Sequence, residues 1–217
     1  MAETSSAPEP EIQYASLAHQ GETAEIGIWA FLSTEILFFG GMFLVYALYR
    51  QAFPIGFAEG SKDTKFIIGT VNLFILLTSS FTMAWAVELA GTEARRALTV
   101  LLLVTAALGL IFIGLKGFEY YEDVWIDHDF PGIIFPMSKP DARANELFWL
   151  LYWMLTGLHA VHLSIGVGLV LTFAHRAWRG AYIRYGKPIE ILGYYWTFVD
   201  LMWVVLWTLI YLPGRNI

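Results

Sequence analysis

The chain has 217 residues, of which 57% are hydrophobic and only 15% are charged. Its mean hydropathy of +0.57 is typical of a protein embedded in a lipid bilayer and not of a soluble domain. The net charge of −6 argues against nucleic acid as a partner. The absence of cysteine excludes disulfides, thiolate metal sites and cysteine nucleophiles.

Five apolar segments are long enough to cross a bilayer core of about 30 Å, which requires about 20 helical residues. They cover approximately residues 27–49, 66–90, 97–118, 147–174 and 191–212. All eight prolines fall outside these segments, so the helices are expected to be regular. The sequence therefore predicts an all-α fold, a polytopic membrane helix bundle with five transmembrane helices.

Residues 1–26 are predicted to form a polar tail that could end in a short surface helix, and residues 27–217 the five-helix transmembrane domain. The acidic N-terminus lacks the basic region of a signal peptide, so the first span is expected to be retained. Charge does not decide the orientation, because each side of the membrane would carry six lysine and arginine residues. The basic loop at 175–190 slightly favours a cytoplasmic N-terminus.

The first span carries a glutamate, Glu35, near its centre. A carboxylate in the middle of a membrane helix costs about 2.5–3.5 kcal/mol on insertion scales, which makes it a functional candidate by default. Two interpretations are open: a proton-accepting or gating carboxylate, and a structural carboxyl hydrogen-bonded to another helix. His159 is the polar residue at a similar depth in the fourth span, and it is the expected hydrogen-bond acceptor.

The fifth span contains a second embedded carboxylate, Asp200. Three tryptophans follow helical spacing with it and share its stripe of the helix: Trp196, Trp203 and Trp207. Their indole N–H groups can donate hydrogen bonds to the carboxylate or shield it from lipid. As for Glu35, a structural role is the alternative to a functional one.

His159 and His162 lie three residues apart and can share one flank of the fourth span. Two histidines could ligate a metal or a haem. A haem held between helices needs a facing axial ligand, however, and no other span has a central histidine. The pattern therefore favours structural hydrogen bonding, and no metal site is predicted.

Two further pairs of polar residues are expected to act within or between helices. Asn72 and Ser79 are seven residues apart, so they share a face on which small polar groups typically join helices. Lys116 and Glu119 are three apart and could pair near the membrane interface. The acidic stretch that continues to Asp129 is predicted to be a solvated face, with a docking surface for a basic partner as the alternative.

Taken together, these motifs resemble subunit III of the haem–copper respiratory oxidases, in its short five-helix bacterial form. The resemblance extends over about residues 15–212, and one segment from each span carries it: residues 31–39, 77–84, 114–120, 155–162 and 195–203. One position departs from the family pattern, because Thr197 stands where the family usually has a histidine.

The resemblance implies a non-catalytic accessory subunit of a bacterial terminal oxidase that reduces O2 to water with proton pumping. Subunit I would hold the haems and copper, and this chain would stabilise it, together with other oxidase subunits, in the cell (inner) membrane with a cytoplasmic N-terminus. The family also implies sustained proton uptake and phospholipid bound in a cleft between the first helices and the remaining bundle. The expected lipid contacts are Arg50, Tyr46 and Trp196.

Two other functions are compatible with parts of the pattern. A subunit-III-like protein could accompany a quinol oxidase or a nitric oxide reductase, since nothing in the sequence identifies the electron donor. A proton-coupled transporter is disfavoured, because such folds usually show internal repeats and discontinuous helices, and this chain shows neither.

Overall fold

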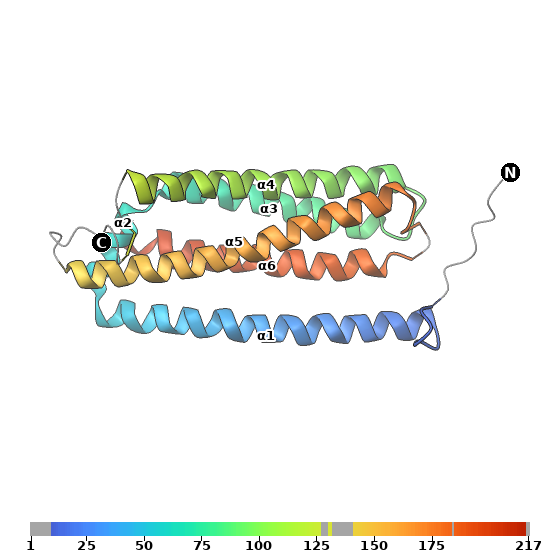
Figure 1. Ribbon diagram of the computed structural model, residues 1–217, viewed down its shortest axis with the longest axis horizontal. Helices are drawn as coiled ribbons and strands as arrows, with labels where there is room; N and C mark the ends of the chain where they lie inside the picture. The colour runs from blue at the N-terminus through green and yellow to red at the C-terminus, as the bar shows by residue number, and fades with distance from the viewer. Residues whose placement is uncertain (1–9, 127–129, 132–140, 184, 216–217) are drawn as a thin grey trace.

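The computed structural model describes residues 10–126, 130–131, 141–183 and 185–215, and their regular structure is helical throughout. Five helices are long and apolar enough to cross a membrane. They are α1 (Leu17–Ala52), α3 (Phe66–Leu89), α4 (Arg95–Trp125), α5 (Ala142–Trp178) and α6 (Lys187–Tyr211). A short helix, α2 (Pro54–Asp63), follows α1, and a 3₁₀ turn, η1 (Pro213–Arg215), follows α6 (Figure 1). The predicted all-α bundle with five spans is confirmed.

Several element boundaries differ from the sequence-based prediction. The helix α4 continues to Trp125, beyond the predicted end at about 118, and α5 begins at Ala142, before the predicted start at about 147. The first helix begins at Leu17, because the Ser16 hydroxyl caps it by accepting a hydrogen bond from the backbone N–H of His19. Residues 17–26 of the predicted tail are therefore the start of α1. The predicted loop at 50–65 contains α2, with Pro54 in its first turn, where a missing N–H costs nothing. Residues 1–9 of the tail, and residues 127–129 and 132–140 of the predicted acidic loop, lie outside the described residues.

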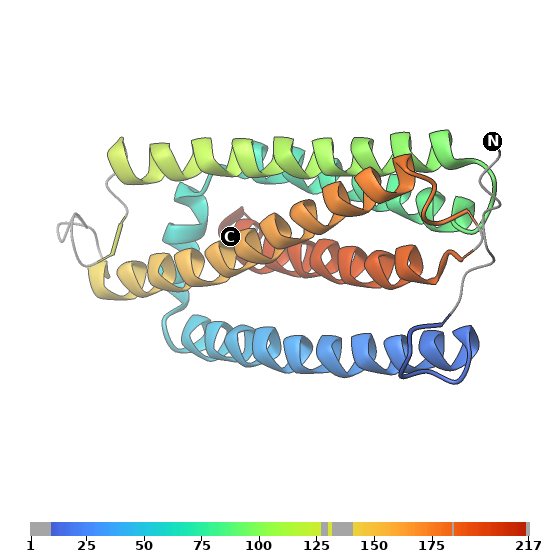
Figure 2. The ribbon, with the colours of Figure 1, turned by 45° about the vertical axis from the view of Figure 1, so that its right-hand side comes forward.

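The helices α3, α4, α5 and α6 pack closely, whereas α1 stands apart from them (Figures 1 and 2). The large buried side chains of the bundle include Trp149, Trp196 and Trp203. In α1 the buried side chains are Leu32, Phe39 and Tyr46, which recur every seven residues. That spacing makes one narrow stripe along a helix, so α1 contacts the bundle along a line and exposes most of its surface.

The short helix α2 packs against the start of α5 at the end of the bundle opposite the N-terminus (Figure 1). Gly56 and Gly60 allow this close approach, because a Cβ at Gly60 would lie 2.3 Å from a ring carbon of Phe148. Ser61 ties α2 to the chain's end: its hydroxyl donates to the Ile210 carbonyl at 2.7 Å and accepts from Gly214 N–H at 3.1 Å.

We expect Gly60→Ala to lower the free energy of unfolding by about 1–3 kcal/mol, because Phe148 is fully buried and has little room to move. Thermal unfolding of the purified protein in detergent measures the change. Gly114→Ala in α4 is the matched control, since a Cβ there meets no atom within 4 Å. Equal melting temperatures for the two variants would show that α2 does not need this close packing.

Candidate functional site

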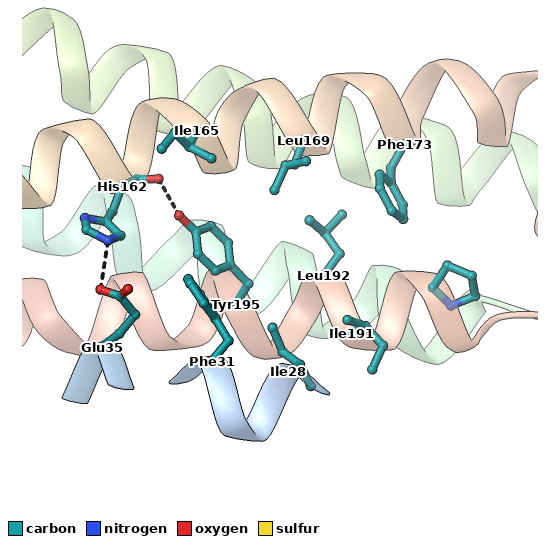
Figure 3. Close-up of a pocket in the computed structure, with 11 residues that line it drawn as sticks. Ile28, Phe31, Glu35, His162, Ile165, Leu169, Phe173, Ile191, Leu192 and Tyr195 are labelled. Carbon is teal, nitrogen blue, oxygen red and sulfur yellow. Dashed lines mark hydrogen bonds and ion pairs between the residues drawn. The ribbon is translucent and has the colours of Figure 1, made fainter. Parts of the chain in front are cut away.

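A cavity of about 520 Å³ lies between α1 and the pair α5 and α6 (Figure 3). Its lining is almost entirely apolar. The lining residues are Ile28, Phe31 and Glu35 from α1, His162, Ile165, Leu169 and Phe173 from α5, and Pro188, Ile191, Leu192 and Tyr195 from α6. This cavity separates α1 alone from the bundle, whereas the cleft implied by the resemblance would lie between the first helices and the rest; the second span, α3, packs with α4 and α6.

The polar group of this cavity is a pair formed by Glu35 and His162, whose side chains lie 3.1 Å apart between Oε2 and Nε2 (Figure 3). The other ring nitrogen of His162, Nδ1, lies 2.9 Å from the carbonyl oxygen of Leu158. A carbonyl can only accept, so Nδ1 must carry a hydrogen. The Glu35–His162 contact then requires one further proton, supplied either by a neutral Glu35 carboxyl or by a cationic imidazole.

His159, the acceptor expected from the sequence, does not reach Glu35. Its ring is buried between Phe112 and Trp203, with ring centroids 5.6 and 5.0 Å away. Neither of its nitrogens hydrogen-bonds to a described residue. That prediction was wrong because a spacing of three residues leaves about 60° between two side chains on a helix. His162 faces the cleft and His159 faces the core.

The two histidines therefore do not form a ligand pair. Among the described residues, no group of three His, Cys, Asp or Glu side chains is close enough to hold a metal ion.

A tyrosine completes the wall of the cavity beside His162. The Tyr195 hydroxyl donates to the His162 carbonyl at 2.9 Å and joins α6 to α5 (Figure 3).

The second embedded carboxylate, Asp200, joins α6 to α3. Ser79 lies 3.3 Å from its Oδ2, and the hydroxyl of Ser80 donates to the same oxygen. Trp196, which one interpretation of the sequence placed beside Asp200 as a donor, does interact with that carboxylate and also donates to the hydroxyl of Ser79 at 3.1 Å. Asn72, expected on the same face as Ser79, is also buried, but its amide makes no hydrogen bond to a described residue.

The predicted pair of Lys116 and Glu119 forms at 3.1 Å, and both side chains are fully buried between the helices. Asp123 is buried beside it, so this part of the acidic stretch is not a solvated face. Two tyrosines that the sequence analysis missed, Tyr152 and Tyr211, complete the cluster. The local signals in this cluster were the spacing of three residues between Lys116 and Glu119 and of four between Glu119 and Asp123.

The residues expected to contact lipid have different positions. Trp196 is fully buried in the bundle, so its assignment as a lipid contact was wrong. Tyr46 is also fully buried, and its hydroxyl donates to the Leu209 carbonyl at 2.6 Å. Arg50 is exposed beside it at the end of α1. Thr197, which replaces the usual family histidine, is exposed on α6.

Polar contacts hold α1 to the bundle at three levels. At its N-terminal end, Glu25 pairs with Lys187 at 2.7 Å, and Lys187 also contacts Glu190 at 3.2 Å. Glu35 and His162 form the middle contact, and the Tyr46 hydroxyl forms the one at the far end. The cavity lies between the first and second of these contacts.

We expect Glu35→Leu to loosen α1, because the bond to His162 is lost, whereas Glu35→Gln keeps a donor for Nε2. The chain has no cysteine, so spin labels can be placed on the exposed positions Leu37 and Val161 without background. Pulsed electron paramagnetic resonance should show a broader or longer distance distribution for Glu35→Leu only. Thr34→Val is the control, since the Thr34 hydroxyl bonds within its own helix. An unchanged distribution in Glu35→Leu would contradict the role of the pair.

Comparison with known proteins adds a family match over nearly the whole chain. The model of the cytochrome c oxidase subunit III family matches residues 14–215. The chain is 31% identical over 188 residues to cytochrome c oxidase subunit 3 of Synechocystis sp., which covers 86% of this chain and 74% of that protein.

Two further relatives are similar over most of both chains. Cytochrome c oxidase subunit 3 of Thermostichus vulcanus is 28% identical, with 88% of this chain and 87% of the relative covered. A protein named probable quinol oxidase subunit 3 of Staphylococcus saprophyticus is 26% identical, with 91% and 92% covered.

Proposed function

This chain belongs to the cytochrome c oxidase subunit III family, and we propose that it stabilises the haem-bearing catalytic subunit of a terminal oxidase as a non-redox accessory subunit. It is a multi-pass membrane protein and subunit III of an oxidase complex. The observation that supports the accessory role is that its central polar residues make contacts within the protein. Both central histidines are engaged in packing or in the pair with Glu35, and the embedded carboxylates bond to other side chains.

The redox centres of the complex are assigned to its partner subunits. Haem or copper would need at least one exposed or convergent set of histidine or carboxylate ligands. Among the described histidines, His159 is enclosed by Phe112 and Trp203, and His162 is held by Glu35 and the Leu158 carbonyl. His19 and His175 are exposed, but no group of three His, Cys, Asp or Glu side chains forms among the described residues. These residues do not fit a haem or a copper ion, so the chemistry of oxygen reduction belongs to subunit I.

The cleft beside α1 is proposed to hold phospholipid. Its apolar lining and its position between membrane-spanning helices match the chemistry of acyl chains. At the N-terminal end of the cleft, Lys187 and Tyr185 lie near the first turns of α1 and can contact a headgroup. Bound acyl chains would replace the helix contacts that α1 lacks and would keep α1 at a fixed distance from α5 and α6.

We propose that this subunit sustains proton uptake by the complex. The Glu35–His162 pair lies at the apolar cleft and joins α1 to α5, so its proposed contribution is to hold α1 in position. We place the protein in the bacterial cell (inner) membrane with its N-terminus in the cytoplasm, as the family resemblance implies. The partner is subunit I of a haem–copper oxidase.

A quinol oxidase is the second candidate complex, because a staphylococcal relative named probable quinol oxidase subunit 3 is similar over nearly its whole length. The two candidates share the subunit and differ in the electron donor. Oxygen consumption by the purified complex with reduced cytochrome c, and separately with a quinol, distinguishes them.

Filling the cleft should displace the lipid. Leu169→Trp places a larger ring in the cavity, and native mass spectrometry of the complex should detect less retained phospholipid than in the wild type. Initial oxygen consumption should stay near the wild-type rate, while activity should decline faster during continued turnover. The expected cause is an α1 helix that is no longer supported along its length.

Leu171→Trp is the matched control, because Leu171 is equally exposed but does not line the cavity. Equal lipid content in both variants would contradict lipid binding in this cleft. An immediate loss of turnover in Leu169→Trp would place the cleft on the proton or oxygen path itself and would contradict the accessory role.

A further inference from the structure

A second polar cluster, unrelated to the cleft, lies near the C-terminal end of α4 and is entirely buried. Lys116 donates to the hydroxyl oxygens of Tyr152 on α5 and Tyr211 on α6, both at 2.9 Å. Its ammonium also pairs with Glu119 Oε2 at 3.1 Å. Two of these contacts are hydrogen bonds and the third is an ion pair, so the ammonium has three oxygen atoms around it. The cluster therefore joins three helices around one buried cation and two carboxylates, Glu119 and Asp123.

The two tyrosines make three contacts with the carboxylates, but they carry only two hydroxyl hydrogens. Tyr211 lies 2.7 Å from Glu119 Oε1. Tyr152 lies 3.0 Å from the same oxygen and 2.8 Å from Asp123 Oδ2. Each of these three oxygen–oxygen distances is that of a hydrogen bond. Two tyrosine hydroxyls provide two hydrogens, so Tyr152 must share one hydrogen between two carboxylates unless a carboxyl group supplies a third.

The third hydrogen is better placed on Asp123 than on Glu119. The ammonium of Lys116 contacts Glu119 directly, which favours a negative charge on that carboxylate. Asp123 has no such ion pair among the described residues. Its Oδ1 and Glu119 Oε2 are both buried without a hydrogen-bond donor, but only Oε2 has an ammonium beside it. An ionised Asp123 would also give the buried cluster a net charge of −1, which is costly away from solvent.

We propose that Asp123, Glu119 and Lys116 form a proton-binding site, in which Asp123 holds one dissociable proton and donates it to the hydroxyl oxygen of Tyr152. Tyr152 then donates to Glu119, and Tyr211 donates to the same carboxylate. Every contact has one hydrogen, and the cluster is neutral, with one ammonium, one carboxylate and one carboxylic acid. Loss of the proton would leave Tyr152 between two carboxylates with a single hydrogen to share.

The groups around the site do not remove the need for this proton. The Lys116 ammonium also faces the rings of Tyr120 and Trp203, which accept no proton. Lys65, which precedes α3, acts on Asp123 electrostatically. Its ammonium is 3.9 Å from Glu122 and about one third exposed, so the solvent and that carboxylate screen it.

Infrared spectroscopy of the full-length purified protein tests the proposal, because a protonated carboxyl group has a carbonyl stretch that a carboxylate lacks. Asp123→Asn should remove one such band and leave the protein folded, since the amide N–H can replace the donor to Tyr152. Tyr152→Phe should shift the same band to higher frequency, because the acceptor is lost. Glu122→Gln, a change at the partly exposed neighbour, should leave the band in place.

The band can also be assigned without altering the cluster. In an Asp200→Asn background, labelling with 13C-aspartate should shift the Asp123 band, and labelling with 13C-glutamate should not. Retention of every carboxyl band in Asp123→Asn would overturn the proposal, as would loss of the band in Glu119→Gln alone. If Asp123→Asn fails to fold, the 13C-aspartate experiment still tests the proposal. The absence of a shifted carboxyl band in that labelled protein would overturn the proposal.

Discussion

Contact between helices in a bilayer depends mainly on close packing and polar bonds, since lipid is as apolar as the side chains and no hydrophobic force drives the helices together. This constraint explains why α1 and the other four spans behave differently. The stripe of Leu32, Phe39 and Tyr46 gives α1 little packing area. Its position therefore depends on the bond between Glu35 and His162 and on polar contacts at either end of the helix.

The other four helices are also held together by close packing and polar bonds, but they have much more of both than α1. Asp200 with Ser79 and Ser80 joins α6 to α3, and the cluster around Lys116 joins α4, α5 and α6. Large aromatic side chains fill the space between these two polar centres. A rigid bundle and a loosely attached helix leave an apolar cavity between them, and this geometry suits an accessory subunit that holds lipid without performing redox chemistry.

The sequence was sufficient for the spans, because about 20 consecutive apolar residues have few alternatives to a membrane helix. Local spacing also predicted the Lys116–Glu119 pair, but not its complete burial between the helices. The start of α1 was missed because its first turns are polar. The helix α2 was missed because glycines and a proline in ten residues are typical of a loop, and only its packing against α5 explains them.

The details of the sites depended on contacts between distant residues. The sequence could not decide which of His159 and His162 faces Glu35, because either can lie at the right depth. Trp196 was assigned to lipid because buried and lipid-facing positions of a membrane helix are equally apolar. The involvement of Tyr152 and Tyr211 with Glu119 joins residues 33 and 92 positions apart, and no periodicity predicts such a contact.

Purification of the tagged protein from its membrane in mild detergent tests the central claim most directly. The account predicts a stoichiometric complex with a haem–copper catalytic subunit, identified by mass spectrometry and by its haem absorbance. It also predicts that this chain, separated from the complex, carries no haem or copper of its own. Isolation of the chain without an oxidase partner, or with bound haem after separation, would contradict its role as an accessory subunit.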